Sequence, residues 1–192
     1  VGDVTGEIVF TTAMTGYLET LTDPSYYGQI VVQTFPLIGN YGIIPSDFEC
    51  DNSHVKAYIV REWCQEPSNF RSKGVLDAFL KSEGIVGIYN IDTRALTKII
   101  REHGVMNARI TSSIDSSDEI VKKLKSYKID NAVKSVSCTS ILHSQKNADS
   151  KYNVVLWDFG TKENIKRELE KHGCSVTVVP SSITANEITA LK

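Results

Sequence analysis

The chain has 192 residues, 41% of them hydrophobic and 23% charged, and its formal net charge is −2. This is the composition of a globular protein that can bury a core. It lacks the basic stripe of a nucleic-acid-binding protein and any apolar run of the roughly 18 residues that cross a bilayer, so we expect neither nucleic acid nor a membrane as a partner.

The cysteines are scattered along the chain. Their spacing bears on two questions: whether they bind a metal, and in which compartment the protein is found. No C-x-x-C pair occurs and no histidine pair at ligand spacing accompanies the thiols, so we expect no structural zinc site. The start of the chain has no signal-type apolar core. We therefore expect a cytoplasmic protein with four reduced thiols, Cys50, Cys64, Cys138 and Cys174.

The first 63 residues predict three strands separated by turn-rich segments. Runs of apolar residues, alternating or continuous, favour strands over 8–12, 29–35 and 56–63. The segment around the second strand is unusual, because the β-branched run Ile30-Val31-Val32 lies between two clusters of turn residues. One cluster is Asp23-Pro24-Ser25, in which proline fixes φ and the Asp and Ser side chains can bond nearby backbone N–H groups.

This turn has two interpretations, which the residues leave open. It can be a structural loop that only joins its neighbours. It can also be a rigidly framed loop that presents Ser25 to a ligand or to a neighbouring domain.

Helices with marked ends follow the third strand. Ser72 is expected to cap a helix that Gly84 ends. Asp92 is expected to cap a second helix over Thr93–His103, which Gly104 ends. The apolar face of this second helix has the i, i+3, i+4 spacing of residues that point into a core, and consists of Leu96, Ile99 and Ile100.

Two more strands and a third helix complete this part of the chain. A short buried strand is expected over 85–89, and another strand over 105–111. Ser116-x-x-Glu119 has the spacing of a capping box before a further helix. After it, residues 139–152 are polar, and we interpret them as an interdomain linker.

The remaining residues predict a β-α-β unit. Strands are expected over 153–157 and 175–179, joined by a turn at Gly160 and a helix over 161–172 with Ile165 and Leu169 facing inward. A Thr184-x-x-Glu187 capping box then begins another helix. Two parallel strands are the start of a doubly wound α/β sheet, most of which we expect beyond Lys192.

No complete catalytic motif is present. Asp158-Phe159-Gly160 matches the metal-binding tripeptide of kinases, but it directly follows a strand and precedes a helix, which favours a plain strand-to-helix turn. The chain has no dinucleotide or P-loop fingerprint, no Gly-x-Ser-x-Gly elbow and no H-E-x-x-H.

Three stretches nevertheless resemble one family closely. They are GEIVFTTAMTGYLETLTDPSYYGQIVVQTFPLIGNYGI, SNFRSKGVLDAFLKSEGIVGIYNIDTRALTKIIREHG and YNVVLWDFGTKENIKRELEKHGCSVTVVP. In order, they resemble the small subunit of glutamine-hydrolysing carbamoyl phosphate synthetases over essentially the whole chain.

The resemblance implies an α/β fold in two parts. Residues 1–138 would form a layered β/β/α domain of the swivelling type, 139–152 the linker, and 153–192 the start of a flavodoxin-like class I glutamine amidotransferase domain. The catalytic Cys, His and Glu of that domain would lie beyond Lys192, so no catalytic residue is expected within these 192 residues. Cys174 does not match the nucleophile and is expected to pack.

The resemblance also implies a reaction and partners. A cysteine thiolate would release ammonia from L-glutamine, and a large synthetase subunit would combine it with bicarbonate and ATP to make carbamoyl phosphate for arginine and pyrimidine synthesis. ATP and Mg²⁺ would bind that large subunit, and no cofactor or metal is expected in this chain. Ser25 matches the family residue that reaches the bound glutamine.

The sequence leaves two other assignments to compare with this one. A non-catalytic relative with the nucleophile replaced would have only a structural or regulatory role, and the deciding position lies outside this chain. Another class I amidotransferase, such as that of anthranilate or guanylate synthesis, is disfavoured because those families lack this amino-terminal domain.

Overall fold

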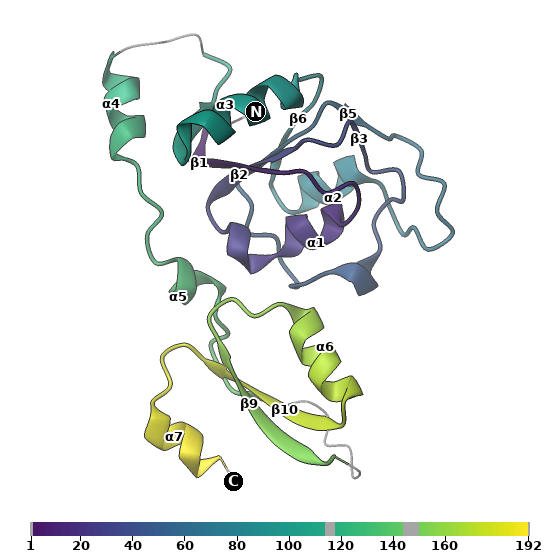
Figure 1. Cartoon of the computed structure of the whole chain (residues 1–192), viewed down its shortest axis with the longest axis vertical. Helices are drawn as coiled ribbons and strands as arrows, with labels where there is room; N and C mark the ends of the chain where they lie inside the picture. Colours follow the sequence, from purple (N-terminus) through teal and green to yellow (C-terminus); the bar gives the residue numbers. More distant parts are fainter. Residues whose placement is uncertain (1, 114–117, 144–149, 192) are drawn as a thin grey trace. The chain divides into compact units, whose positions relative to one another are not determined.

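The strands and helices divide between two units of the chain, Val1–Asp130 and Asn131–Lys192. They come from a computed structural model, which describes residues 2–113, 118–143 and 150–191 (Figure 1). None of the helices in these ranges is long and apolar enough to cross a membrane.

A five-stranded mixed sheet forms the centre of the first unit, in the order β6-β4-β2-β1-β7. The first four of these strands run parallel to one another, and β7 pairs with β1 in the antiparallel sense. The strands are β1 (Val4–Thr11), β2 (Gln29–Gln33), β4 (Ala57–Ile59), β6 (Val86–Ile88) and β7 (Met106–Ile110).

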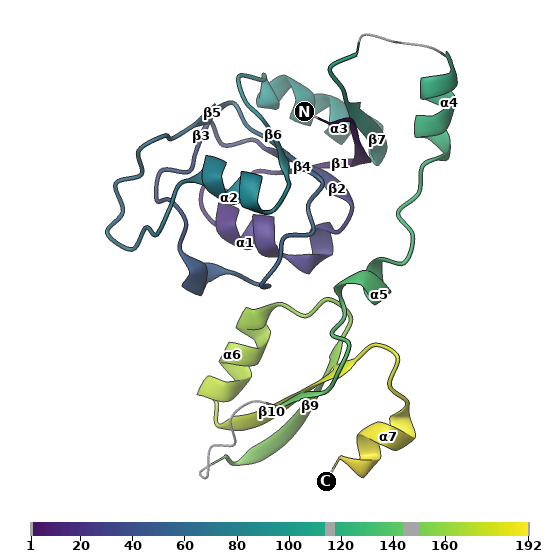
Figure 2. The ribbon, with the colours of Figure 1, turned by 180° about the vertical axis from the view of Figure 1, so that it is seen from behind.

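Helices cover both faces of this sheet. Figures 1 and 2 show α1 (Tyr17–Thr22) and α2 (Leu76–Ser82) on one face and α3 (Thr93–His103) on the other. The β-branched run of β2 supplies both cores, because side chains alternate along a strand. Val31 packs in the cluster with α1 and α2, whereas Ile30 and Val32 pack in the cluster with Ile100 of α3. All three are fully buried, as a central strand covered on both faces requires.

The strand expected over 56–63 is in fact two strands in different sheets. β4 ends at Ile59, the chain bends at Arg61, and β5 (Glu62–Trp63) pairs in parallel with β3 (Leu37–Ile38). The apolar pattern continues across the bend, so the pattern alone could not show where the chain leaves the sheet. The strand expected over 85–89 is confirmed as β6, but it is half-buried rather than buried because it lies at the edge of the sheet.

The helix predicted over Thr93–His103 is confirmed as α3. The Oδ1 atom of Asp92 accepts the N–H of Ala95 at 2.9 Å, and Gly104 follows the last turn. Its inward face differs in one position, because Ile99 is 46% exposed while Thr97 is buried and shares a 2.8 Å hydrogen bond with Thr34.

The helix expected after Ser72 begins later than predicted. α2 starts at Leu76 with Val75 at its N-cap and no side-chain cap. The predicted capping role of Ser72 is therefore wrong, and its hydroxyl instead donates to the carbonyl of Gly74 at 3.0 Å. The helix α1 was not predicted at all.

A further helix, α4 (Asp118–Ser126), follows β7. Asn107 of β7 donates from Nδ2 to the carbonyls of Leu124 and Tyr127, at 2.7 and 3.0 Å, which ties the end of α4 to the sheet. Ser116 of the predicted capping box lies outside the described residues.

The second unit confirms the predicted β-α-β pattern. β9 (Tyr152–Asp158) and β10 (Cys174–Pro180) pair in parallel and are joined by α6 (Glu163–Lys171). The Thr184–Glu187 capping box is present at the start of α7 (Ala185–Ala190). The inward position predicted for Ile165 is wrong, because this side chain is 47% exposed.

Part of the expected linker takes part in the sheet of this unit. The short α5 (Ala132–Val136) precedes it, and β8 (Leu142–His143) pairs with β10 in the antiparallel sense. Residues 144–149 of the expected linker lie outside the described residues. The domain division at 139–152 therefore stays a prediction.

Candidate functional site

The turn that carries Ser25 is a single 3-10 turn, Pro24–Tyr26, which follows α1 after Asp23. The side chain of Asp23, which is 6% exposed, accepts the N–H of Ser25 at 2.9 Å. The carbonyl of the same residue accepts the N–H of Tyr26 at 3.1 Å. Hydrogen bonds to Asp23 thus fix the backbone of Ser25, while its side chain is exposed.

The helix in front of this turn is held by two tyrosines. The hydroxyl of Tyr41 accepts the N–H groups of Gly16 and Tyr17, at 2.9 and 3.1 Å, at the point where α1 begins. The hydroxyl of Tyr17 donates to the carbonyl of Gly42 at 2.5 Å, and the two rings stack with centroids 4.1 Å apart. Because first-turn N–H groups have no partner within a helix, Tyr41 takes the place of a local capping residue.

Burial keeps these two phenols protonated. Removal from water raises the pKa of Tyr17, and it likewise raises the pKa of Tyr41. Because Tyr17 is neutral, its hydroxyl can donate the hydrogen bond to the Gly42 carbonyl.

The second turn-rich cluster of the sequence has a specific geometric role. Gly42 has φ +70°, and a Cβ at this position would lie 2.0 Å from Ser72 Oγ and 2.8 Å from the carbonyl oxygen of Gly74. Only glycine fits this backbone and this space. The turn brings Tyr41 and the Gly42 carbonyl to α1, so the two turn clusters form one structure around Ser25.

The far end of α1 is fixed as well. The Thr22 hydroxyl donates to the carbonyl of Leu18 at 2.7 Å and accepts the N–H of Glu49 at 2.9 Å. Both ends of the helix are therefore bound to other parts of the first unit before the chain reaches Ser25. Such a frame can hold a small polar group at a constant position for a ligand, without spending binding energy on ordering the loop.

Among the residues that the structure describes, the other nucleophilic and metal-binding side chains form no second site of this kind. The four cysteines are free. Cys50 Sγ lies 3.9 Å from His54 Nε2, and burial lowers the pKa of His54, so its neutral imidazole gives this thiol no cationic neighbour. In the part of the chain that the structure describes, no three His, Cys, Asp or Glu side chains come together as metal ligands.

The Asp158-Phe159-Gly160 tripeptide is confirmed as a strand-to-helix turn. Asp158 Oδ1 accepts the N–H groups of Gly160 and Thr161 at 2.9 and 2.8 Å, and Oδ2 accepts the N–H of Cys138 at 2.6 Å. Burial by itself raises the pKa of this carboxyl, but these three backbone donors outweigh burial and hold the pKa below its ordinary value. Both carboxylate oxygens of Asp158 are therefore used in hydrogen bonds to backbone N–H groups.

Sequence reasoning located Ser25 but not the frame around it. Tyr17, Tyr26 and Tyr27 are visible as aromatic neighbours of the turn in the sequence, whereas the contact from Tyr41 spans 24 and 25 residues. The one available signal was the pair of glycines around Asn40-Tyr41, which marked a special turn without showing what it touches.

Comparison with known proteins shows that the sequence matches one family. Residues 1–110 match the family described as carbamoyl-phosphate synthase small chain, CPSase domain. Proteins named carbamoyl phosphate synthase small chain are 46% identical in Syntrophotalea carbinolica, 48% in Listeria monocytogenes and 50% in Streptococcus pneumoniae, over 99%, 97% and 97% of this chain. The chain spans about half the length of these relatives, 54%, 51% and 51%.

Proposed function

The chain belongs to the carbamoyl-phosphate synthase small-chain family, and from this premise we propose that the complete protein is the glutamine-hydrolysing subunit of a carbamoyl phosphate synthetase. It supplies ammonia to a large subunit, which uses bicarbonate, ATP and Mg²⁺ to make carbamoyl phosphate for arginine and pyrimidine synthesis. The two chains form a heterodimer in the cytoplasm.

The finer domain assignments belong to this proposal. The first unit, with its five-stranded and two-stranded sheets, is the swivelling-type domain of the family. The parallel pair β9 and β10 with the helix between them begins a flavodoxin-like class I amidotransferase domain. Support for the second assignment is the parallel crossover itself, which is the building unit of doubly wound sheets.

One observation carries the role of this chain in the reaction. Ser25 is exposed at the tip of a turn whose backbone is fixed by Asp23 and whose preceding helix is fixed at both ends. An exposed hydroxyl on such a frame is suited to hold the charged end of glutamine while a cysteine elsewhere in the complete protein attacks the side-chain amide. Ser25 is a binding residue in this proposal and takes no part in bond breaking.

The replacement Ser25→Ala in the complete two-subunit enzyme tests this role. A hydrogen bond to a charged group contributes roughly 1.5–3 kcal/mol, so kcat/KM for glutamine should fall by about 10- to 150-fold. Free ammonia bypasses the glutamine site, so carbamoyl phosphate synthesis from added ammonia should hardly change.

The comparison of the two nitrogen sources decides between the alternatives. An equal loss with glutamine and with ammonia would assign the turn to folding or to subunit contact. No loss with either would remove the Ser25 hydroxyl from the glutamine site. A wild-type complex that makes carbamoyl phosphate from ammonia but not from glutamine would instead identify a relative without a working amidotransferase.

A further inference from the structure

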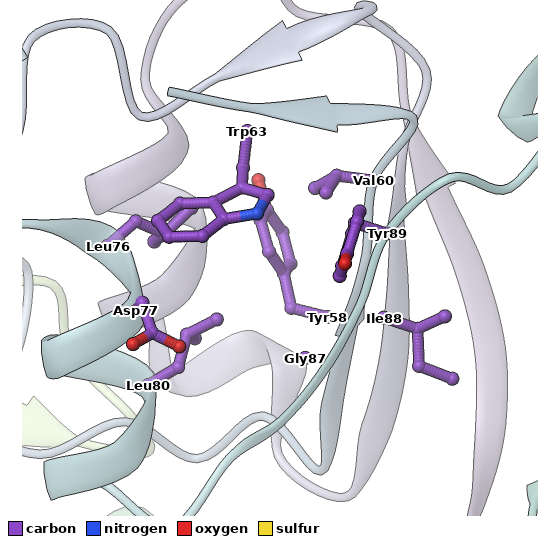
Figure 3. A pocket seen from close by; sticks show the side chains of 9 residues that line it. All are labelled: Tyr58, Val60, Trp63, Leu76, Asp77, Leu80, Gly87, Ile88 and Tyr89. Carbon is purple, nitrogen blue, oxygen red and sulfur yellow. The ribbon is translucent and has the colours of Figure 1, made fainter. Parts of the chain in front are cut away.

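A pocket opens on the first unit at the edge of the five-stranded sheet, where α2, β4, β5 and β6 meet. Its volume is about 140 Å³. Figure 3 shows the indole of Trp63 lying across it between Leu76 and Tyr89, with the ring of Tyr58 behind. The side chains that matter for the chemistry are Tyr58, Trp63, Leu76, Asp77, Leu80 and Tyr89.

Three aromatic rings give the pocket its chemical character. The hydroxyl of Tyr58 donates to Gln33 Oε1 at 3.0 Å inside the core, so the pocket receives the ring of this residue rather than its polar end. Tyr89 is 64% exposed and stands at the opening. Aromatic faces carry negative potential, which attracts cations more strongly than neutral groups.

Asp77 is the one charged residue among those that line the pocket in the described part of the chain. Its Oδ2 atom lies 2.6 Å from Lys81 Nζ, one turn further along α2, and these side chains are 45% and 74% exposed. Exposed pairs of this kind contribute little to stability. A second cation can therefore share the carboxylate or displace Lys81 from it.

Gly87 keeps the floor of the pocket open. It lies in the middle of β6, and its backbone is not in the left-handed region that favours glycine. A Cβ at this position would lie 3.1 Å from Leu80 Cδ1, and both residues line the pocket. A glycine that the backbone conformation does not require, inside a strand, marks a place where another group approaches closely.

Size and position indicate what kind of molecule that group belongs to. A volume of about 140 Å³ holds one group the size of a benzene ring and is smaller than the roughly 300 Å³ of a site for a whole small molecule. β6 is also an edge strand, which pairs with β4 alone among the described strands. An edge strand offers backbone donors and acceptors to an extended polypeptide, and a pocket beside it receives one side chain of that polypeptide.

We propose that this pocket receives an arginine side chain of an extended segment of a partner polypeptide that lies along β6. The planar guanidinium stacks on Trp63 and reaches the carboxylate of Asp77, while the aliphatic part of the side chain fills the space above Gly87. Arginine fits better than lysine, because its flat, weakly hydrated group both stacks on rings and forms forked contacts with carboxylates. The inference is independent of glutamine binding at Ser25.

Fluorine NMR of the complete protein labelled with 5-fluorotryptophan tests the proposal, with the Trp63 signal assigned by its loss in Trp63→Phe. The probe is N-acetyl-L-argininamide, and its neutral isostere N-acetyl-L-citrullinamide is the matched control. We expect the argininamide to shift the Trp63 signal saturably, with a Kd in the millimolar range as suits a single side chain, and the citrullinamide to bind at least about 10-fold more weakly.

Variants at three positions, Asp77, Lys81 and Gly87, separate the charge from the shape of the pocket. Asp77→Asn should weaken argininamide binding about 10-fold and leave citrullinamide binding unchanged, since it removes charge and almost no volume. Lys81→Gln removes the competing cation and should preserve or strengthen binding. Gly87→Val fills the floor and should abolish binding, and circular dichroism checks that this variant remains folded.

Three outcomes would overturn the proposal. Equal binding of the two probes would mean a plain apolar pocket. A Trp63 signal that never moves with argininamide would mean that no guanidinium enters. Binding of free L-arginine about 10-fold or more tighter than the capped probe would identify a small metabolite, rather than a polypeptide, as the occupant.

Discussion

Tyr41 and Gly42 bind the start of α1 from a distant part of the sequence. In most helices a capping residue within a few positions of the helix end makes such hydrogen bonds. The Tyr41 hydroxyl accepts hydrogen bonds from two N–H groups at the start of the helix, and the Gly42 carbonyl accepts one from the Tyr17 hydroxyl. Gly42 is required here because its φ is positive and because Ser72 and Gly74 leave no room for a side chain. Residues far from Ser25 in the sequence thereby determine where its hydroxyl lies.

A matched pair of glycine replacements separates these two requirements. Gly42 and Gly84 have nearly the same φ, +70° and +68°, but no atom lies within 4 Å of a Cβ at Gly84. Gly84→Ala should therefore cost about 1–2 kcal/mol of unfolding free energy, from backbone strain alone. Gly42→Ala should cost about 1–3 kcal/mol more, because the Gly74 backbone must also move.

Urea unfolding of the two variants and the parent chain measures both costs. Equal losses for the two replacements would show that the space around Gly42 is less restrictive than the structure indicates. A larger loss for Gly84→Ala than for Gly42→Ala would contradict the argument from close approach.

At the level of helices and strands, the sequence predicted best those elements whose signals are local. α3 has an Asp cap, an apolar stripe and a terminal glycine within its own residues, and its bounds were predicted without error. α1 is six residues long, with only Tyr17, Leu18 and Leu21 on its apolar face and no side-chain cap or terminal glycine of its own. The hydroxyl that accepts its first N–H groups comes from the distant Tyr41. The break between β4 and β5 was missed for the same reason, because the pairing of β5 with β3 depends on residues distant in sequence.

The same limit applies to the candidate sites: local sequence signals predicted Ser25, but contacts between distant residues could not be predicted. Composition and turn chemistry placed Ser25 on a special turn, and the Asp23 side chain makes the hydrogen bond that such a turn favours. The pocket at Trp63 could not be predicted, because it is formed by side chains from four elements that only the fold brings together. Gly87 was visible in the sequence, but a glycine in a strand has no meaning until its neighbours are known.

The turn between β9 and α6 should make the second unit sensitive to acid. Asp158 is 7% exposed, and its carboxylate is stabilised by three backbone N–H groups that an unfolded chain does not provide. Because its pKa is lowered on folding, its contribution is fully present above the unfolded pKa of about 3.9 and is lost as the pH falls through the lower, folded value. We expect the unfolding free energy of this unit to decrease from about pH 5 downward.

The replacement Asp158→Asn checks the origin of this dependence. An amide oxygen can accept some of these hydrogen bonds without titrating, so the variant should be less stable near neutral pH and should lose less stability in acid. The measurement is the unfolding midpoint at several pH values, followed through the neighbouring Trp157. If parent and variant lost stability in parallel, other carboxylates would be responsible.

Across the whole molecule, the apolar core is unevenly distributed between the two units. The first unit holds two clusters of buried side chains, one on each face of its sheet. Among the described residues of the second unit, the buried hydrophobic side chains are only Val176, Val178 and Val179. Several of its large apolar side chains are at least a third exposed, including Leu142, Trp157, Phe159 and Ile165.

This difference predicts that the 192-residue chain unfolds in two steps. Each square ångström of apolar surface removed from water contributes about 25 cal/mol, so the unit with fewer buried side chains should unfold at a lower urea concentration. The two tryptophans report separately, because Trp63 lies in the first unit and Trp157 in the second. With 5-fluorotryptophan in both positions, the native fluorine signal of Trp157 should disappear before that of Trp63.

Trp63→Phe and Trp157→Phe assign the two signals and show whether either label changes the order. A single midpoint shared by both signals would mean that the two units unfold as one cooperative block, and the reverse order would mean that buried apolar surface does not decide which unit is weaker.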